Sequence, residues 1–178
     1  SLIKTDYQLR NLSGALKVLE LLKIELKQEK IQKALDAITL RGRFQVFKCK
    51  NKEWVIDVAH NNQASLSLVK SAKKLPAAVN NLGVFGLQKT KRLHDFFEPL
   101  IGLVDLWFLP DLNEANFWSA NEIEALLKKL GVRRKNIFVF KSTSDAMDAI
   151  NLRSDEDRVL VAGSFVVVKN VLEEIEAK

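Results

Sequence analysis

The hydrophobic positions of the chain follow two different periods, and the change falls near residue 41. Before it, apolar residues recur at the three- and four-residue spacing of amphipathic helices. The first stripe is Leu12, Ala15, Leu16, Leu19, Leu22 and Leu26, and the second is Ile31, Ala34, Leu35 and Ile38. We predict two helices here, each with an apolar face that needs a partner surface.

From residue 41 onward, short apolar runs alternate with stretches of helical spacing. The predicted strands are 44–50, 52–58, 80–85, 103–109, 137–140 and 158–162. The predicted helices are 62–74, 91–100, 121–130, 142–151 and 165–175. We expect a hairpin turn around Asn51-Lys52 and a helix end at Gly131. Ser142 or Ser144 is expected to cap the helix that follows 137–140.

This alternation predicts an α/β fold. Strands separated by helices of about 10 to 15 residues imply a mostly parallel, Rossmann-like sheet with helices on both faces. The first hairpin strand would be an antiparallel addition at the edge. We therefore predict a domain over 41–178, preceded by a short helical segment over 1–40. Because nothing precedes these helices to cover them, we expect 1–40 to be the end of another domain that is mostly absent.

Charge leaves one further class of function open. The net charge of +6 suits a polyanionic partner. The lysines are interleaved with glutamates, however, which is typical of a solvated face. A basic module that binds nucleic acid is therefore kept only as an alternative, one that would show steeply salt-dependent affinity.

The remaining bulk properties favour a cytoplasmic protein. No apolar run approaches the roughly 18 residues of a membrane span, and the first residues carry no secretory pattern. The single cysteine, Cys49, cannot form an internal disulfide, which favours a reducing compartment. We expect a monomer in the cytoplasm, without a membrane partner.

The predicted strand 52–58 runs into polar residues that suggest a site. In an α/β sheet, side chains at the carboxyl ends of strands face the crevice where ligands bind. Asp57 can bind ribose hydroxyls or a metal-bound water there, and the His60 imidazole can orient a polar substrate or coordinate a cation. The structural alternative is that Asp57 or Asn61 caps the next helix and that His60 is an exposed loop residue.

Two other positions suit anions. Arg43, within the charged run 41–44, has a planar guanidinium that donates two hydrogen bonds to phosphate or carboxylate oxygens. Its alternative is a charged turn between domains. Ser164, within the junction 163–165, opens a helix whose N-terminus favours an anion. Its alternative is an ordinary serine cap.

Common nucleotide and catalytic motifs are missing from the sequence. It contains no Gly-x-x-x-x-Gly-Lys-Ser/Thr phosphate loop, no Gly-x-Gly-x-x-Gly fingerprint, no Cys/His zinc spacing and no Gly-x-Ser-x-Gly elbow. We therefore expect neither a complete nucleotide site nor a metal site in this chain.

Four blocks nevertheless follow one another in a recognisable order and spacing. They are Gly42-Arg43-Phe44-Gln45, Asp57-Val58-Ala59-His60-Asn61, Val84-Phe85-Gly86 and Gly163-Ser164-Phe165. Together they resemble the C-terminal part of the folylpolyglutamate and dihydrofolate synthases of the Mur ligase superfamily. The resemblance covers nearly the whole chain.

The resemblance implies an ATP-dependent, ADP-forming ligase that adds L-glutamate to dihydropteroate or folate through an acyl phosphate. It also implies that 1–40 are the last helices of an N-terminal ATPase domain, which would supply the phosphate loop and the Mg²⁺ ligands. ATP, Mg²⁺, L-glutamate and the pterin are then the expected ligands. This chain alone is expected to be inactive.

Site roles follow from the same resemblance. Asn11 resembles the family's adenine-contacting asparagine, and Arg43 the arginine that reaches the ATP phosphates. Asp57 resembles the acid that contacts ATP from the C-terminal domain. His60 and Ser164 resemble residues that line the glutamate pocket. Arg43, Asp57 and His60 are the predicted catalytic residues.

Several departures from the family pattern bear on the substrate, two of them close to the predicted site residues. Asn62 stands where proline is common, and the run 88–91 replaces a more usual Asp-Lys-Asp. An alternative within the superfamily is a ligase that joins an amino acid to a UDP-sugar cell-wall precursor. The acceptor, a UDP-sugar or a pterin, distinguishes the two.

Overall fold

The computed structural model describes residues 6–25, 27–37 and 41–177. The chain divides into two compact units, Ser1–Arg41 and Gly42–Lys178. This division coincides with the change of hydrophobic period in the sequence. Leu26 and Ile38, which belong to the predicted helical stripes, lie outside the described residues.

The first unit is helical, as the sequence predicts. It contains α1 (Asp6–Leu21) and α2 (Gln28–Ala37). Large apolar side chains of this unit stay exposed, among them Leu21 at 70% and Leu22 at 64%. Since apolar burial is the main stabilising term of packing, these side chains add little to the stability of the unit by itself.

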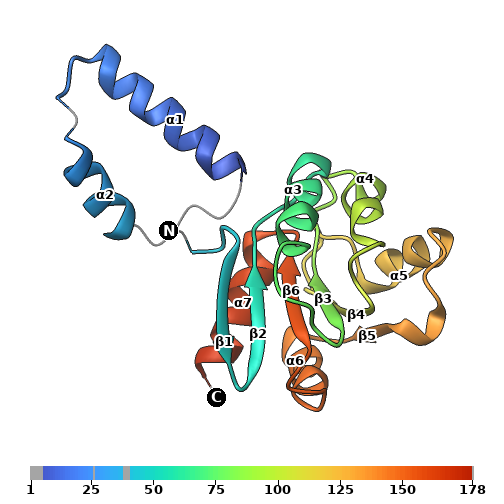
Figure 1. Ribbon diagram of the computed structural model, residues 1–178. Coiled ribbons are helices and arrows are strands. Elements are labelled where there is room, and N and C mark those ends of the chain that lie inside the picture. Colours follow the sequence, from blue (N-terminus) through green and yellow to red (C-terminus); the bar gives the residue numbers. More distant parts are fainter. Residues whose placement is uncertain (1–5, 26, 38–40, 178) are drawn as a thin grey trace. The chain divides into compact units, whose positions relative to one another are not determined.

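The second unit is an α/β domain built on a six-stranded sheet of order β1-β2-β6-β3-β4-β5 (Figure 1). The strands are β1 (Gln45–Cys49), β2 (Lys52–Ile56), β3 (Asn81–Phe85), β4 (Leu106–Pro110), β5 (Ile137–Phe140) and β6 (Arg158–Ala162). The helices are α3 (Asn62–Ala72), α4 (Leu93–Phe97), α5 (Ala120–Lys129), α6 (Thr143–Asn151) and α7 (Phe165–Glu176), with single 3₁₀ turns η1 (Glu98–Leu100) and η2 (Arg134–Asn136).

The strand directions confirm the predicted sheet. β2, β6, β3, β4 and β5 pair in parallel, and β1 pairs antiparallel with β2 at one edge. The hairpin turn is one residue earlier than predicted, because Lys52 already pairs with Cys49. Lys50 and Asn51 form the turn with positive φ angles of 49° and 64°, the backbone that a tight two-residue hairpin requires.

Helices cover both faces of the sheet, and the strand pattern shows why. Successive side chains of a strand point to opposite faces. In β2, Val55 belongs to the buried cluster that includes residues of α3, α4 and α5, whereas Trp54 and Ile56 belong to the cluster that includes residues of α6 and α7. Leu160 and Val161 of β6 divide in the same way. Both faces are therefore apolar along the central strands, as a parallel sheet buried on two sides requires.

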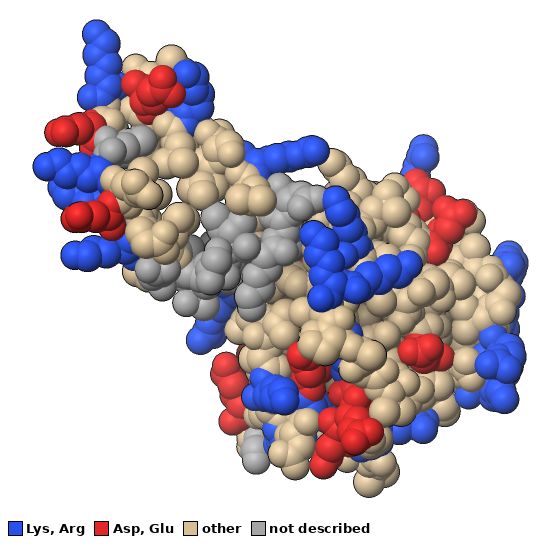
Figure 2. Space-filling view, viewed as in Figure 1, with Lys and Arg blue, Asp and Glu red and all other residues tan. Residues whose placement is uncertain are grey.

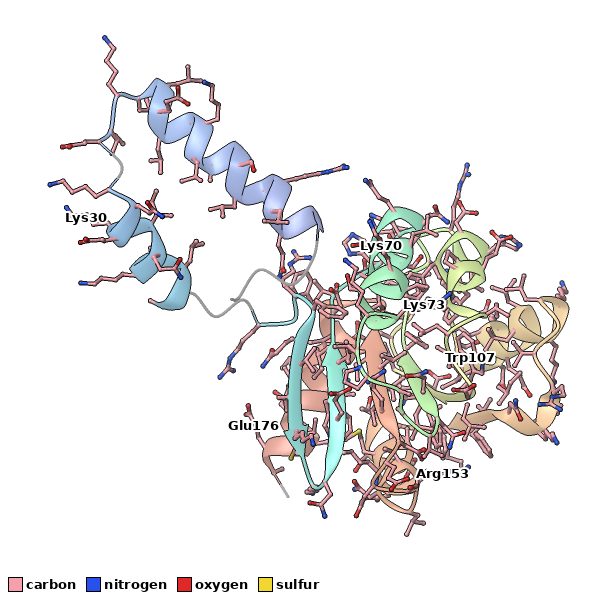
Figure 3. The ribbon with its side chains drawn as sticks, in the orientation of Figure 1. Lys30, Lys70, Lys73, Trp107, Arg153 and Glu176 are labelled. Atoms are coloured by element: carbon pink, nitrogen blue, oxygen red, sulfur yellow. The ribbon has the colours of Figure 1, made fainter. Side chains whose placement is uncertain are left out.

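Aromatic packing fills the core on the α3–α5 face. Phe85 lies edge-on to Phe96 and Phe97, with ring centroids 6.1 and 5.8 Å away. Trp107, labelled in Figure 3, lies 5.6 Å from Phe85. Each such pair adds about 0.5–1.5 kcal/mol beyond burial of area. On the other face, the guanidinium of Arg153 lies over Phe138, 5.1 Å from its ring centroid (Figure 3).

Helix ends follow the predicted capping residues. Ser142, rather than Ser144, caps α6 by accepting a hydrogen bond from the Asp145 N–H at 3.1 Å. Gly131, with a φ of 88°, lies directly after the C-cap residue of α5. Asn61 caps α3 through the Ala64 N–H at 2.9 Å.

The sheet order creates a topological switch point. β6 is the last strand in sequence but lies between β2 and β3. The helices that follow β2 and β3 pack on one face, and α7, which follows β6, packs on the other (Figure 1). Chains leaving neighbouring strands in opposite directions open a crevice at the carboxyl ends of β2, β6 and β3, where α/β sheets bind ligands.

Surface charge shows no single basic stripe on the face drawn in Figure 2. Several lysines and arginines gather near the middle of this view, while acidic and basic side chains lie near each other at the lower part of the α/β domain, and most of the surface is neither (Figure 2). The basic group is local and does not extend as a continuous stripe across the drawn face, so this view does not favour the nucleic-acid alternative. Within the described ranges, no helix is both long and apolar enough to cross a membrane.

Candidate active site

The carboxylate of Asp57 fastens the end of β2 to the segment before β1. Asp57 follows directly after β2 and is 7% exposed. Its Oδ2 accepts a hydrogen bond from the Phe44 N–H at 2.9 Å, and its Oδ1 accepts one from the Ala59 N–H at 2.8 Å. Asp57 is therefore not a helix cap, a role that Asn61 fills.

Burial raises the pKa of Asp57 to about 6, from an ordinary value of 3.8. The loss of hydration of the charged carboxylate is the largest cause. The N–H groups of Ala59 and Phe44 and the charges of Arg43 and His60 act in the opposite direction. At neutral pH the carboxylate is still mostly ionised, because the pH exceeds the pKa by about one unit.

This shift predicts a pH-dependent stability. Between pH 3.8 and about 6 the folded chain holds a proton on Asp57 that the unfolded chain has lost. The free energy of unfolding therefore falls as the pH rises through this window, by about 3 kcal/mol for about two units. Urea unfolding of the wild type and of Asp57→Asn across this range should show the fall only in the wild type. Parallel curves for the two proteins would contradict it.

Arg43 lies in a turn that is held on both sides. The Val58 N–H donates to the Gly42 carbonyl at 2.8 Å, and Phe44 donates to Asp57 on the other side. Gly42 and Phe44 both have positive φ angles, 68° and 47°. The side chain of Arg43 lies against α7, where its guanidinium carbon is 5.9 Å from the centroid of the Phe165 ring.

Ser164 caps α7, which is the structural alternative that the sequence left open. Its hydroxyl oxygen accepts a hydrogen bond from the Val167 N–H at 3.1 Å, and the residue is 7% exposed. Gly163, just before it, donates its N–H to the Ala59 carbonyl at 2.7 Å. The junction after β6 is thus bonded directly to the junction after β2, which carries Asp57 and His60.

His60 is half-buried, and its hydrogen bonding indicates which ring nitrogen can accept a hydrogen bond from a ligand. Nδ1 lies 2.9 Å from the Val58 carbonyl oxygen. A carbonyl only accepts hydrogen bonds, so Nδ1 carries a proton in this contact. In the neutral ring, Nε2 is then a hydrogen-bond acceptor.

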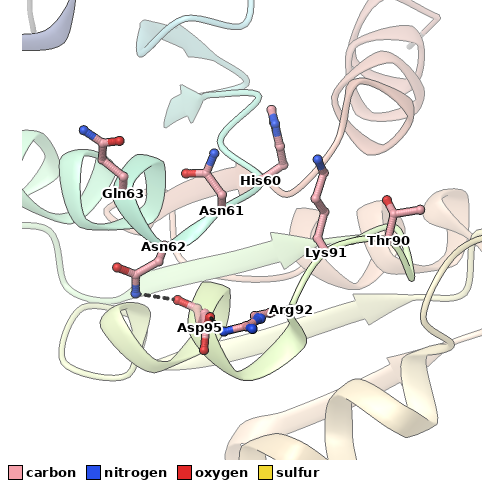
Figure 4. Close-up of a pocket in the computed structure, with 8 residues that line it drawn as sticks. All are labelled: His60, Asn61, Asn62, Gln63, Thr90, Lys91, Arg92 and Asp95. Carbon is pink, nitrogen blue, oxygen red and sulfur yellow. Dashed lines mark hydrogen bonds and ion pairs between the residues drawn. The ribbon is translucent and has the colours of Figure 1, made fainter.

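His60 also lines a pocket of about 440 Å³ between the start of α3 and the segment before α4 (Figure 4). The lining residues are His60, Asn61, Asn62, Gln63, Thr90, Lys91, Arg92 and Asp95. In Figure 4 the side chains of His60 and Lys91 point in the same direction from these two segments. The lining residues carry side-chain amides, a hydroxyl, two cations and one carboxylate, and the cations and amides suit a small polar anion.

One wall of the pocket is held by Asp95. The side-chain amide of Asn62 donates to the Asp95 carbonyl at 2.8 Å, which joins α3 to α4. The Asp95 carboxylate lies 3.6 Å from the Arg92 guanidinium. Asn62, a departure from the family pattern, thus makes a contact that proline has no side-chain amide to make.

The structure brings together four of the five predicted site residues. Arg43, Asp57, His60 and Ser164 all lie at the carboxyl ends of β2 and β6 or in the turn bonded to them. Asn11 lies in α1 of the first unit and is exposed, so its role as an adenine contact stays a prediction.

The sequence predictions missed the second wall of the pocket. Thr90, Lys91, Arg92 and Asp95 were not predicted as site residues. One signal pointed to two of them, Thr90 and Lys91, because the polar run 88–91 follows the carboxyl end of β3 and departs from the family pattern.

The grouping of possible ligand side chains bears on the expected magnesium ion. In the described ranges no three or more His, Cys, Asp or Glu side chains group as metal ligands. Mg²⁺ at nucleotide sites is commonly held by one or two carboxylates together with substrate phosphates, so this finding concerns only a site built from three or more such side chains. The Arg43 guanidinium, in contrast, is a group that suits phosphate oxygens.

Fold and site together define a Rossmann-like α/β domain with a polar, cationic crevice at its topological switch point. Residues 42–165 match the family described as the Mur ligase, glutamate ligase domain. The match covers more than half of the chain, and the chain belongs to this family.

Curated relatives extend the similarity beyond the matched domain. The dihydrofolate synthase/folylpolyglutamate synthase of Escherichia coli K12 is 32% identical over 169 residues, which cover 94% of this chain and 38% of the relative. The protein of the same name from Buchnera aphidicola of Baizongia pistaciae is 30% identical, covering 82% and 33%. The chain thus spans about two fifths of the length of the first relative and one third of the second.

Solved structures share the fold. Escherichia coli FolC in complex with DHPP and ADP superposes with a TM-score of 0.80 at 32% identity, covering 92% of this chain and 38% of that one. A bifunctional folylpolyglutamate synthase/dihydrofolate synthase with Mn, AMPPNP and L-glutamate bound gives a TM-score of 0.83 at 26% identity, covering 97% and 40%.

Proposed function

We propose that this chain is the glutamate-side, C-terminal part of an ATP-dependent ligase that joins L-glutamate to dihydropteroate or folate through an acyl phosphate. One observation carries the proposal. Arg43, Asp57 and His60, which stand in the family's motif blocks, meet at one edge of the sheet beside a pocket that suits a small anion. The names of the relatives support the same reaction.

Arg43 is the residue we assign to the ATP phosphates. Its guanidinium presents two parallel N–H groups to two oxygens of one phosphate. The turn that carries it is bonded to Asp57, so phosphate binding and the geometry of the β2 junction are linked. As γ-phosphate transfers to the carboxylate of the pterin substrate, a fixed cation stabilises the developing charge without reorganising.

The pocket beside His60 is the site we assign to glutamate. Glutamate brings two carboxylates, which the Lys91 ammonium and the amide side chains of the lining can bind. Its amine must carry a lone pair to attack the acyl phosphate. Nε2 of neutral His60 is an acceptor for an N–H of that amine, because Nδ1 already bonds to Val58. His60 thereby orients the nucleophile and can take up its proton.

We expect Lys91→Met in the full-length enzyme to raise KM for glutamate about 10- to 100-fold, the effect of one lost charged hydrogen bond. KM for ATP should change little. Lys89→Met is the matched control, because Lys89 lies outside the pocket lining and its charge acts on Glu122 of α5. Steady-state kinetics with varied glutamate test this, and an equal rise in KM from both variants would contradict the assignment.

The reaction itself is tested on the longer parent protein, which we expect to be a cytoplasmic monomer. ADP release is followed with MgATP and L-glutamate, with dihydropteroate and tetrahydrofolate offered separately. Turnover with dihydropteroate establishes a dihydrofolate synthase, and turnover with both establishes a bifunctional enzyme. Turnover with neither overturns the proposal and moves the search to UDP-sugar acceptors. The present chain alone should show no turnover, because its sequence contains no Gly-x-x-x-x-Gly-Lys-Ser/Thr phosphate loop to hold ATP.

A further inference from the structure

An aromatic side chain stands exposed at the first position of α7. Phe165 is 65% exposed, although it directly follows the buried residues 158–164. A large apolar ring in water is unfavourable. The guanidinium of Arg43 lies at 5.9 Å from the ring centroid, within the range of about 6 Å at which a cation is attracted to a ring face.

The backbone on either side of Arg43 is fixed independently of this contact. Hydrogen bonds join Gly42 to Val58 and Phe44 to Asp57. The turn is also closely packed, because a Cβ on Gly42 would lie 3.0 Å from Val58 Cγ1 and 3.5 Å from Val168 Cγ1. Val168 lies in α7, one turn after Phe165. The first turns of α7 therefore form the surface on which this turn rests.

The direction of the arginine side chain is set by its own contacts, of which the Phe165 ring is one. A long, half-exposed arginine has many rotamers, and holding one of them costs conformational entropy. An aromatic face stabilises one direction of the guanidinium. Arg43 also lies close enough to Asp57 for its charge to act on that carboxylate.

We propose that Phe165 is a positioning residue, whose ring holds the Arg43 guanidinium at the crevice between the ends of β2 and β6. The anion that Arg43 meets there is the ATP phosphate, and this part rests on the proposed function. Phe165 acts through Arg43 and is not assigned a contact with the nucleotide.

The geometry is tested on this chain without any ligand. A ring face shields protons above it, so the Hε resonance of Arg43 in a ¹H–¹⁵N spectrum should lie upfield of its position in Phe165→Leu. Arg153, which lies over Phe138, is a second arginine expected to be shifted, and its peak should not respond to Phe165→Leu. Arg43→Lys assigns the peak. Phe165→Leu, which keeps an apolar side chain, should move the peak to the ordinary position, and Phe165→Tyr should leave it shifted. An unshifted peak in the wild type would overturn the proposal.

The role is tested by kinetics of the full-length ligase. Phe165→Leu should lower kcat/KM for ATP about two- to fivefold, the strength of an exposed cation–π contact. Phe165→Tyr, which keeps an aromatic ring, should retain the wild-type kcat/KM. In an Arg43→Ala background, Phe165→Leu should have no further effect. The same loss in both backgrounds would overturn the positioning role. Absence of any turnover would refute the proposed function instead, while the spectrum still decides whether the ring holds the guanidinium.

Discussion

Replacing Arg43 by alanine should lower kcat/KM of the full-length ligase about 10²- to 10³-fold, the usual cost of removing one fixed donor from a developing anion. The loss should appear in kcat as well as in KM for ATP, because the charge assists both phosphate binding and phosphoryl transfer. Fold and stability should be retained, since Arg43 is only half-buried and its contact with Phe165 is at the surface. Initial rates of ADP release measure the effect.

The chain offers a matched control two residues away. Arg41 has the same side chain and is exposed, and Arg41→Ala should leave kcat/KM within about twofold of the wild type. Arg43→Lys keeps the charge but loses the planar fork, so it should recover only part of the activity. Equal losses from Arg41→Ala and Arg43→Ala would show that general positive charge, rather than this one guanidinium, supports the reaction.

Local pattern was sufficient for the elements of the sheet. The strands predicted over 137–140 and 158–162 have the bounds of β5 and β6, because each is a short apolar run between turn residues. The strand predicted over 103–109 begins too early. Leu103 and Val104 are buried, but they belong to the turn after η1 and pack under the helices. Buried positions favour apolar residues in loops as well as in strands, so an apolar run does not by itself mark where a strand begins.

The order of the strands in the sheet could not be predicted from the sequence pattern. Nothing local to β6 indicates that it pairs with both β2 and β3, since a parallel pair is joined by long-range hydrogen bonds. That pairing is what brings the junction at Gly163 against the junction at Ala59. The site therefore depends on a topological fact that only the structure supplied.

The role of Asp57 shows the same limit. From spacing, its carboxylate was either a ligand group or a cap for the next helix. The structure gives it a third role, since one of its oxygens binds the N–H of Phe44, 13 residues earlier in the chain. The motif resemblance identified Asp57 as a site residue, but only the structure shows that its carboxylate binds the segment before β1.

Gly163→Ala should strongly destabilise the chain, because both the backbone and the surroundings of this glycine exclude a side chain. The φ of Gly163 is 113°, a conformation that side-chain-bearing residues rarely adopt. A Cβ there would lie 2.4 Å from the Gly86 carbonyl oxygen, which is backbone at the end of β3. Strain and overlap together should cost about 3 to 5 kcal/mol. Urea unfolding of the chain measures this loss.

The substitution should also damage the site, because the close approach joins two of its parts. Gly163 donates to Ala59 at 2.7 Å and directly precedes Ser164. A shift of β6 away from β3 would therefore move the start of α7, and Phe165 with it, relative to Arg43. In the full-length ligase, Gly163→Ala should lose activity even below its unfolding temperature.

Gly102→Ala is the control for both measurements. Gly102 lies in a turn of the same unit, and a Cβ there meets nothing within 4 Å. Its unfolding free energy should remain within about 0.5 kcal/mol of the wild type. If Gly163→Ala were as stable as Gly102→Ala, the β6 and β3 junctions would have room to separate. The crevice would then not be fixed by their contact, and the position of α7 would have to depend on its packing against the sheet alone.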